Sequence, residues 1–78
     1  MLATFLADAE VALGKVSRVL KAELCAHPVL VRAAFDAAVV PLVTGFCVEQ
    51  PELCPAAAAG AQRLVDLATS DFLARVCK

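Results

Sequence analysis

An apolar stretch from Pro28 to Val48, PVLVRAAFDAAVVPLVTGFCV, most constrains the fold, because only Arg32 and Asp36 in it are charged. A helix that is apolar on nearly every side must be covered on nearly every side. A chain of 78 residues forms at most one domain, so the segments on either side have to supply that cover. The stretch is therefore predicted to be the central helix of a small bundle.

The composition favours an all-α fold. Hydrophobic residues make up 62% of the chain, above the ~45–50% usual for soluble domains, and part of the excess is alanine, the best helix former. Trp and Tyr are absent, and valines fall at helical rather than alternating spacing. We predict one helical domain over residues 1–78, a small antiparallel bundle of three helices, or of three and a short fourth.

The first helix is expected over about residues 2–26. Its apolar residues recur at spacings of three and four, which is one stripe of a helix: Leu2, Leu6, Ala9, Leu13, Val16, Leu20 and Leu24. It should end before Pro28, because the residue that precedes a proline is pushed out of the α region. Gly14 is interpreted as a point of close approach to a neighbouring helix.

The second helix is expected over residues 28–48, with Pro28 at its first position, where a missing N–H costs nothing. Pro41 removes a backbone hydrogen bond and should kink this helix. The third helix is expected over residues 52–77. Thr69-Ser70-Asp71 could break it near residues 69–71 and cap a short fourth helix. The alternative is a helix that continues to the end.

Four cysteines allow three disulfide pairings. A bond between Cys25 and Cys47 would have to span the second helix, roughly 30 Å, whereas the Cα atoms of a disulfide lie within ~7 Å. An up-down-up bundle brings Cys77 to Cys25 and lets Cys47 meet Cys54 across a short loop. We predict Cys25–Cys77 and Cys47–Cys54, unless a strong bend at Pro41 alters the layout. The alternative is four reduced cysteines in a cytosolic bundle.

Neither a metal centre, a cofactor nor a catalytic site is expected. The cysteines show no Cys-x₂₋₄-Cys spacing, and His27 is the only histidine. No Ser-His-Asp set, carboxylate pair or phosphate-binding glycine loop is present. His27 is interpreted as an exposed turn or capping residue, with haem or metal ligation as the alternative. We expect a protein that is not an enzyme.

Charge and hydropathy bear on partners and location. The net charge is −1 and there is no basic patch, which argues against nucleic acid. The longest uncharged run, Ala37 to Val48, is shorter than the ~20 residues of a spanning helix, so no transmembrane segment is expected. Asp8 and Glu10 interrupt the N-terminal segment, so it does not read as a signal peptide. We expect a secreted chain whose signal peptide is not present here.

Two neighbouring helices cannot cover the central helix on every side. The remaining apolar surface is expected to meet an apolar small molecule or lipid, a protein partner, or a second copy of the chain. Arg32 and Asp36 could anchor a ligand head group, or could form a surface pair one turn apart. The candidate contact residues, of which the phenylalanines are most simply core, are Arg32, Asp36, Phe35, Val39, Leu42 and Phe46.

Three functions follow, in order of preference. The first is a small secreted helical protein that binds an apolar ligand or membrane lipid. The second is a secreted interaction protein, such as an effector, pheromone or toxin-like ligand, that acts on a protein through an exposed helical face. The third is a cytosolic structural homodimer with reduced thiols. A continuous cavity would favour the first function, and a flat exposed patch the second.

The size, helicity and cysteine-tied layout resemble those of saposin-like domains and secretoglobins, both of which carry lipids. Saposin-like domains, however, use six cysteines at other spacings. Secretoglobins place cysteines near both termini, whereas this chain has none before Cys25. We therefore assign no family from the sequence.

Overall fold

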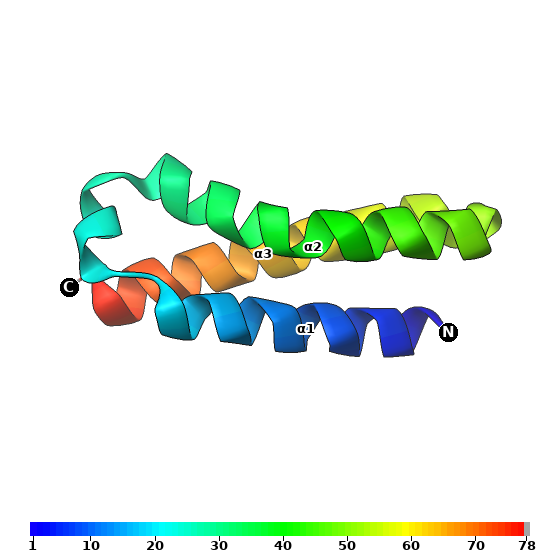
Figure 1. Ribbon diagram of the computed structural model, residues 1–78, viewed down its shortest axis with the longest axis horizontal. Coiled ribbons are helices and arrows are strands. Elements are labelled where there is room, and N and C mark those ends of the chain that lie inside the picture. Colours follow the sequence, from blue (N-terminus) through cyan, green and yellow to red (C-terminus); the bar gives the residue numbers. More distant parts are fainter. Residues whose placement is uncertain (78) are drawn as a thin grey trace.

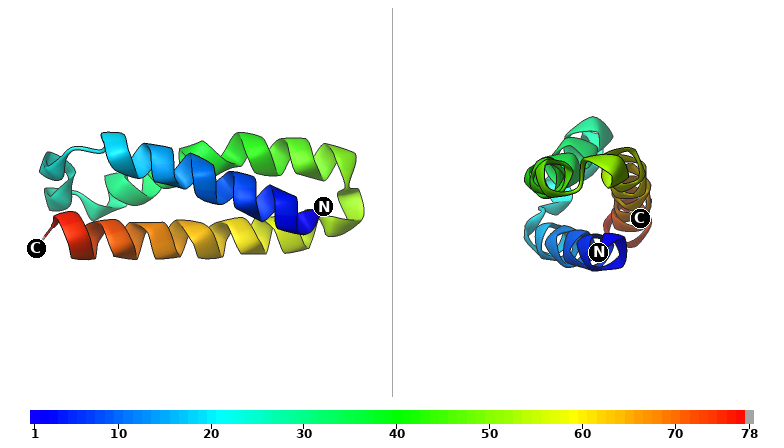
Figure 2. Two further views of the ribbon diagram at one scale, coloured as in Figure 1. Left: turned by 90° about the horizontal axis from the view of Figure 1, so that it is seen from below. Right: turned by 90° about the vertical axis from the view of Figure 1, so that its right-hand side faces the viewer.

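The computed structural model describes residues 1–77. Within that range the chain forms three α-helices, α1 (Leu2–Val19), α2 (Pro28–Glu49) and α3 (Cys54–Val76), with the short 3₁₀ turns η1 (Ala22–Ala26) and η2 (Pro51–Leu53) between them. The helices run up, down and up along a rod of 40 × 18 × 16 Å (Figure 1). Seen end-on they occupy the corners of a triangle (Figure 2). The predicted all-α bundle is confirmed.

The core lies along the axis of this rod and receives one row of buried side chains from each helix. Within a row the buried residues are four apart, or seven apart from Val65 to Phe72, and both spacings keep them close to one face because a turn holds 3.6 residues. Phe35 of α2 and Phe72 of α3 are fully buried and meet edge to face, with ring centroids 6.3 Å apart. The buried residues are Phe5, Ala9 and Leu13 of α1, Val31, Phe35 and Val39 of α2, and Ala57, Ala61, Val65 and Phe72 of α3.

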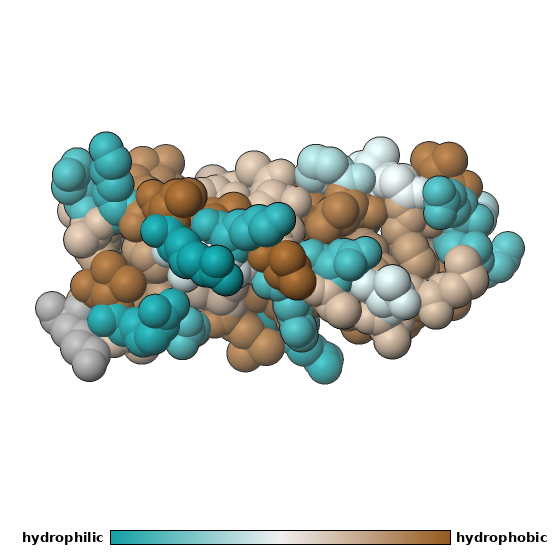
Figure 3. Space-filling model, turned by 60° about the horizontal axis from the view of Figure 1, so that its bottom comes forward, coloured by the Kyte–Doolittle hydropathy of each residue, from teal (hydrophilic) through white to brown (hydrophobic). Residues whose placement is uncertain are grey.

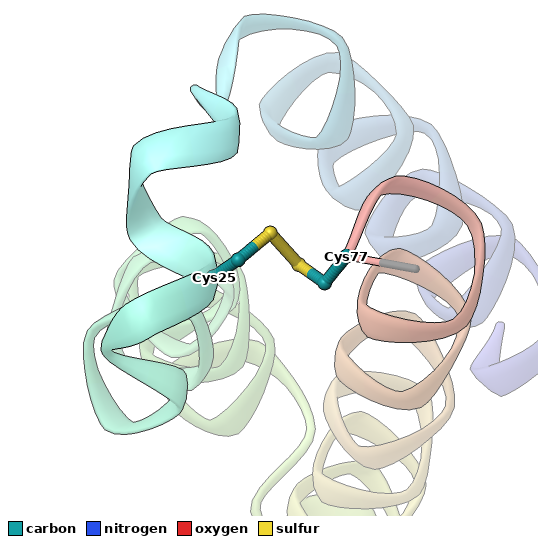
Figure 4. The surroundings of a disulfide bond; sticks show 2 residues. All are labelled: Cys25 and Cys77. Carbon is teal, nitrogen blue, oxygen red and sulfur yellow. A yellow bond between two sulfur atoms is a disulfide. The ribbon is translucent and has the colours of Figure 1, made fainter.

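Two disulfides close opposite ends of the rod, with the pairing that the sequence predicts. The Cα atoms of Cys25 and Cys77 are 5.4 Å apart, and those of Cys47 and Cys54 are 4.7 Å apart. Figure 4 shows the first bond joining η1 to the end of α3. The helix α2 continues through Pro41 and bends near its middle (Figure 1), without disturbing the antiparallel layout.

The predicted end of the first helix is wrong. The helix α1 stops at Val19 rather than near residue 26, and Leu20 and Lys21 are extended, with ψ of 134° and 147°. A continued helix would carry Cys25 about 9 Å beyond Val19 along the α1 axis. The chain instead has to cross toward the start of α2 and bring Cys25 to the end of α3, so it leaves the helix early and forms η1.

Of the two alternatives for the third helix, the structure has the continuous one, because α3 runs without interruption from Cys54 to Val76. The Thr69 hydroxyl donates a hydrogen bond of 2.7 Å to the carbonyl oxygen of Val65, one turn back in the same helix. A threonine bonded in this way does not cap a new helix. There is accordingly no short fourth helix in the described part of the chain.

The close approach expected at Gly14 lies at Gly60 instead. A Cβ at Gly14 would have no neighbour within 4 Å, whereas a Cβ at Gly60 would lie 2.8 Å from Cδ2 of Leu6. Alanine in place of a helical glycine stabilises by about 0.5–1 kcal/mol where it fits. We expect this gain for Gly14→Ala in urea unfolding. Gly60→Ala should gain less because Leu6 has to move, and an equal gain in both variants would contradict the packing described.

Candidate functional site

One side of α2 is exposed along its whole length and carries no charge. We call it the outer face of α2, and it lies opposite the buried row of that helix. Its end residues, Val29 and Val48, are 79% and 76% exposed. It extends for about 29 Å at 1.5 Å per residue. Its members are Val29, Leu30, Ala33, Ala37, Val40, Pro41, Thr44 and Val48.

The charged residues in the middle of α2 turn toward α3 and so leave the outer face uncharged. Arg32 forms an ion pair with Asp66 and donates a hydrogen bond of 3.1 Å to Oε1 of Gln62. Gln62 in turn donates from Nε2 to Oδ1 of Asp36 at 3.0 Å. Arg32 and Asp36 are thus linked through Gln62 and not by the direct pair that their spacing allows. The network is largely exposed, so its direct contribution to stability is small.

The other helices carry charges among their exposed apolar residues. On α1, Val11 and Val19 are exposed, and Lys15 lies between them. On α3, Leu67 is 60% exposed and follows Asp66 directly. Figure 3, which views the bundle obliquely from below, shows hydrophilic side chains interrupting the hydrophobic ones along the rod. The exposed surfaces of α1 and α3 therefore mix charged and apolar side chains, whereas the outer face of α2 carries no charge.

The structure divides the six candidate contact residues among three places. Phe35 and Val39 belong to the core, with 0% and 1% of their surface exposed. Leu42 and Phe46 are half-buried and line a groove between α1 and α2. Arg32 and Asp36 take part in the network with α3. They do not meet in one site, and their contact with a ligand or partner stays a prediction.

Each pair of helices has a groove between them at the surface of the described bundle. The groove between α1 and α3 has a volume of about 570 Å³, the groove between α1 and α2 about 360 Å³, and the groove between α2 and α3 about 150 Å³. The first carries charges of both signs, including Glu10, Arg18, Asp71 and Arg75. Arg75 is already occupied there, because it binds Asp71 at 2.9 Å and Ser17 at 3.2 Å.

Residues with metal-binding or nucleophilic side chains do not gather in one place. Within residues 1–77, no group of three or more His, Cys, Asp or Glu residues could hold a metal ion. All four cysteines are in disulfides. His27 is exposed at the turn between η1 and α2, where its carbonyl oxygen accepts hydrogen bonds from the amides of Leu30 and Val31. The sites that the geometry offers are therefore surfaces and grooves for binding.

The length and composition of α2 are sufficient for a membrane span. Over its 18-residue window the mean hydropathy is 1.7, and 17% of that window is buried in the bundle. The core helix of a small protein passes the same test, so this finding alone does not distinguish the two cases. The expectation that no segment spans a membrane stays a prediction.

The sequence matches no protein-family model, and comparisons with curated proteins and with solved structures found no match. The class of protein therefore rests on the fold itself, a small all-α bundle of three helices tied by two disulfides. Such disulfides are compatible with an extracellular protein, because oxidising compartments preserve them.

Proposed function

We propose that the chain is a secreted, non-enzymatic interaction protein that presents the outer face of α2 to a helix of a protein partner. The observation that carries this proposal is the exposed, uncharged length of that face between Val29 and Val48. Surfaces of this kind mark interaction sites when they are continuous. The open grooves and the continuous face support the second of the three functions expected from the sequence.

The residues of the outer face suit close packing against another helix. Ala33 and Ala37 have short side chains, which let helix axes approach to the lower end of the usual 8–10 Å. Pro41 has no N–H, so the carbonyl oxygen of Ala37 lacks its intrahelical donor and is available to a partner. Disulfides hold both ends of α2, so little conformational freedom is left to lose on binding.

A protein surface fits this face better than a membrane surface does. Helices that lie on membranes combine bulky apolar residues with lysine and arginine along their polar side. The outer face is mostly alanine and valine, and Glu49 and Glu52 lie at its C-terminal end. The net charge of −1 adds no attraction to anionic lipid.

A photo-crosslinking amino acid at Ala37 tests this function in the extracellular fluid of the source organism. We expect it to capture one protein, and the same amino acid at Arg63, which is exposed on α3, should not capture it. Adding Ala33→Glu to the Ala37 probe should remove the crosslink without changing the melting temperature, because Ala33 is exposed.

Three outcomes would contradict the proposal. Capture at Arg63 as strong as at Ala37 would mean that the outer face is not the contact. A crosslink to a second copy of the same chain would support the homodimer. Binding to phosphatidylcholine vesicles that Ala33→Glu abolishes would instead support the lipid function.

A further inference from the structure

The groove between α1 and α2 has an aromatic floor. The rings of Phe5 and Phe46 lie there with centroids 4.9 Å apart, and Leu42 is half-buried beside them. The volume of about 360 Å³ is at the lower end of the range for small-molecule sites. At about 30 Å³ per atom it has room for roughly a dozen non-hydrogen atoms.

The charged side chains that line this groove are both carboxylates, Asp8 and Glu49. The ion pairs described within residues 1–77 are Arg32–Asp66 and Arg75–Asp71, so neither carboxylate is neutralised by one of them. Glu49 is also the last residue of α2, where the helix dipole adds negative potential. Met1 lines the groove as well.

We propose that this groove binds a small organic cation with an apolar tail, namely a protonated amine or quaternary ammonium group on an alkyl or aryl chain. The carboxylates would hold the positive head group, and the half-buried ring of Phe46 would attract it further. The tail would lie against Leu42. The groove between α1 and α3 lacks this selectivity because its arginines and carboxylates offset one another.

This inference is independent of the proposed function, because Asp8, Leu42 and Glu49 are not part of the outer face of α2. A ligand could bind the groove while a partner covers that face. Loss of either activity would leave the other intact, so the two proposals succeed or fail separately.

Hexyltrimethylammonium is a suitable probe, with hexanoate and 1-hexanol as the matched anion and neutral compound. In a ¹⁵N NMR titration we expect shift changes centred on Thr4, Asp8 and Phe46, and much weaker effects of both matched compounds. Asp8→Asn and Glu49→Gln should each weaken binding about fivefold, which corresponds to removing one nearby exposed charge. Raising the ionic strength from about 0.01 to 0.15 M should also weaken it.

Glu23→Gln is the matched control, because Glu23 is an exposed carboxylate in η1 at the other end of the rod. It should leave the affinity unchanged. The proposal would be overturned if hexanoate bound as tightly as the cation, or if Glu23→Gln weakened binding as much as Asp8→Asn. Shift changes centred on the α1–α3 groove would overturn it as well.

Discussion

Replacing Cys25 and Cys77 with alanine should lower the free energy of unfolding by about 4 kcal/mol. The bond closes a loop with a sequence separation of 52 residues, and the entropy that it removes from the unfolded chain grows with loop length. Removing the Cys47–Cys54 bond, with a separation of 7, should cost about 2.5 kcal/mol on the same model. Urea unfolding of the two double variants measures both values.

The comparison between the two double variants is informative because all four cysteines are half-buried. Each double variant shortens two cysteine side chains in similar surroundings, so the difference between their free energies of unfolding reports mainly on loop length. Equal losses in the two variants would show that the bonds act through local packing. A larger loss for the Cys47–Cys54 variant would contradict the loop-length explanation altogether.

Phe35→Ala should cost about 3–5 kcal/mol, the usual range for removing a buried aromatic ring. Phe35 is fully buried and meets Phe72 edge to face, so its removal leaves a cavity in a core of only a few large side chains. A chain of 78 residues is expected to have a stability of roughly 4–12 kcal/mol. The variant should therefore lose a large part of its stability, measured by urea unfolding with the disulfides intact.

Val40→Ala is the control for Phe35→Ala, since Val40 lies on the same helix and is 52% exposed. Its effect should stay within about 0.5 kcal/mol, as for most surface substitutions. A loss as large as that of Phe35→Ala would mean that the side of α2 described as exposed is covered by the rest of the bundle.

The layout of the fold could be predicted because it follows from long-range geometry. Once three helices run up, down and up, only one pairing of the four cysteines places both bonds at helix ends, and the structure has that pairing. Pro28 marks the start of α2 in the sequence, and the structure begins the helix there. These features depend on the lengths of the helices and on their antiparallel order, both of which can be predicted from the sequence.

The details that could not be predicted depend on how each helix meets the neighbouring helices in the folded bundle. The apolar stripe of α1 continues to Leu24, but the crossing to α2 ends the helix at Val19. The spacing of Arg32 and Asp36 allows a direct pair, yet Gln62 from α3 lies between them.

An uncovered apolar side of α2 was expected, but the residues that form it could not be predicted, for a related reason. Val39 and Val40 are identical in the sequence, but Val39 is buried and Val40 is exposed. Because apolar residues surround most of α2, periodicity alone could not show which side the other helices leave uncovered.

The two disulfides close a covalent ring that contains α2 and α3, and the segment before Cys25 extends from this ring. The bonds Cys25–Cys77 and Cys47–Cys54 fasten α2 to α3 at both ends, so these helices stay paired even when their packing loosens. The helix α1 lies outside this ring and is attached to it only through the chain before Cys25. When the oxidised molecule opens, we therefore expect α1 to detach first and to uncover the row of Val31, Phe35 and Val39, while the disulfides keep α2 and α3 together.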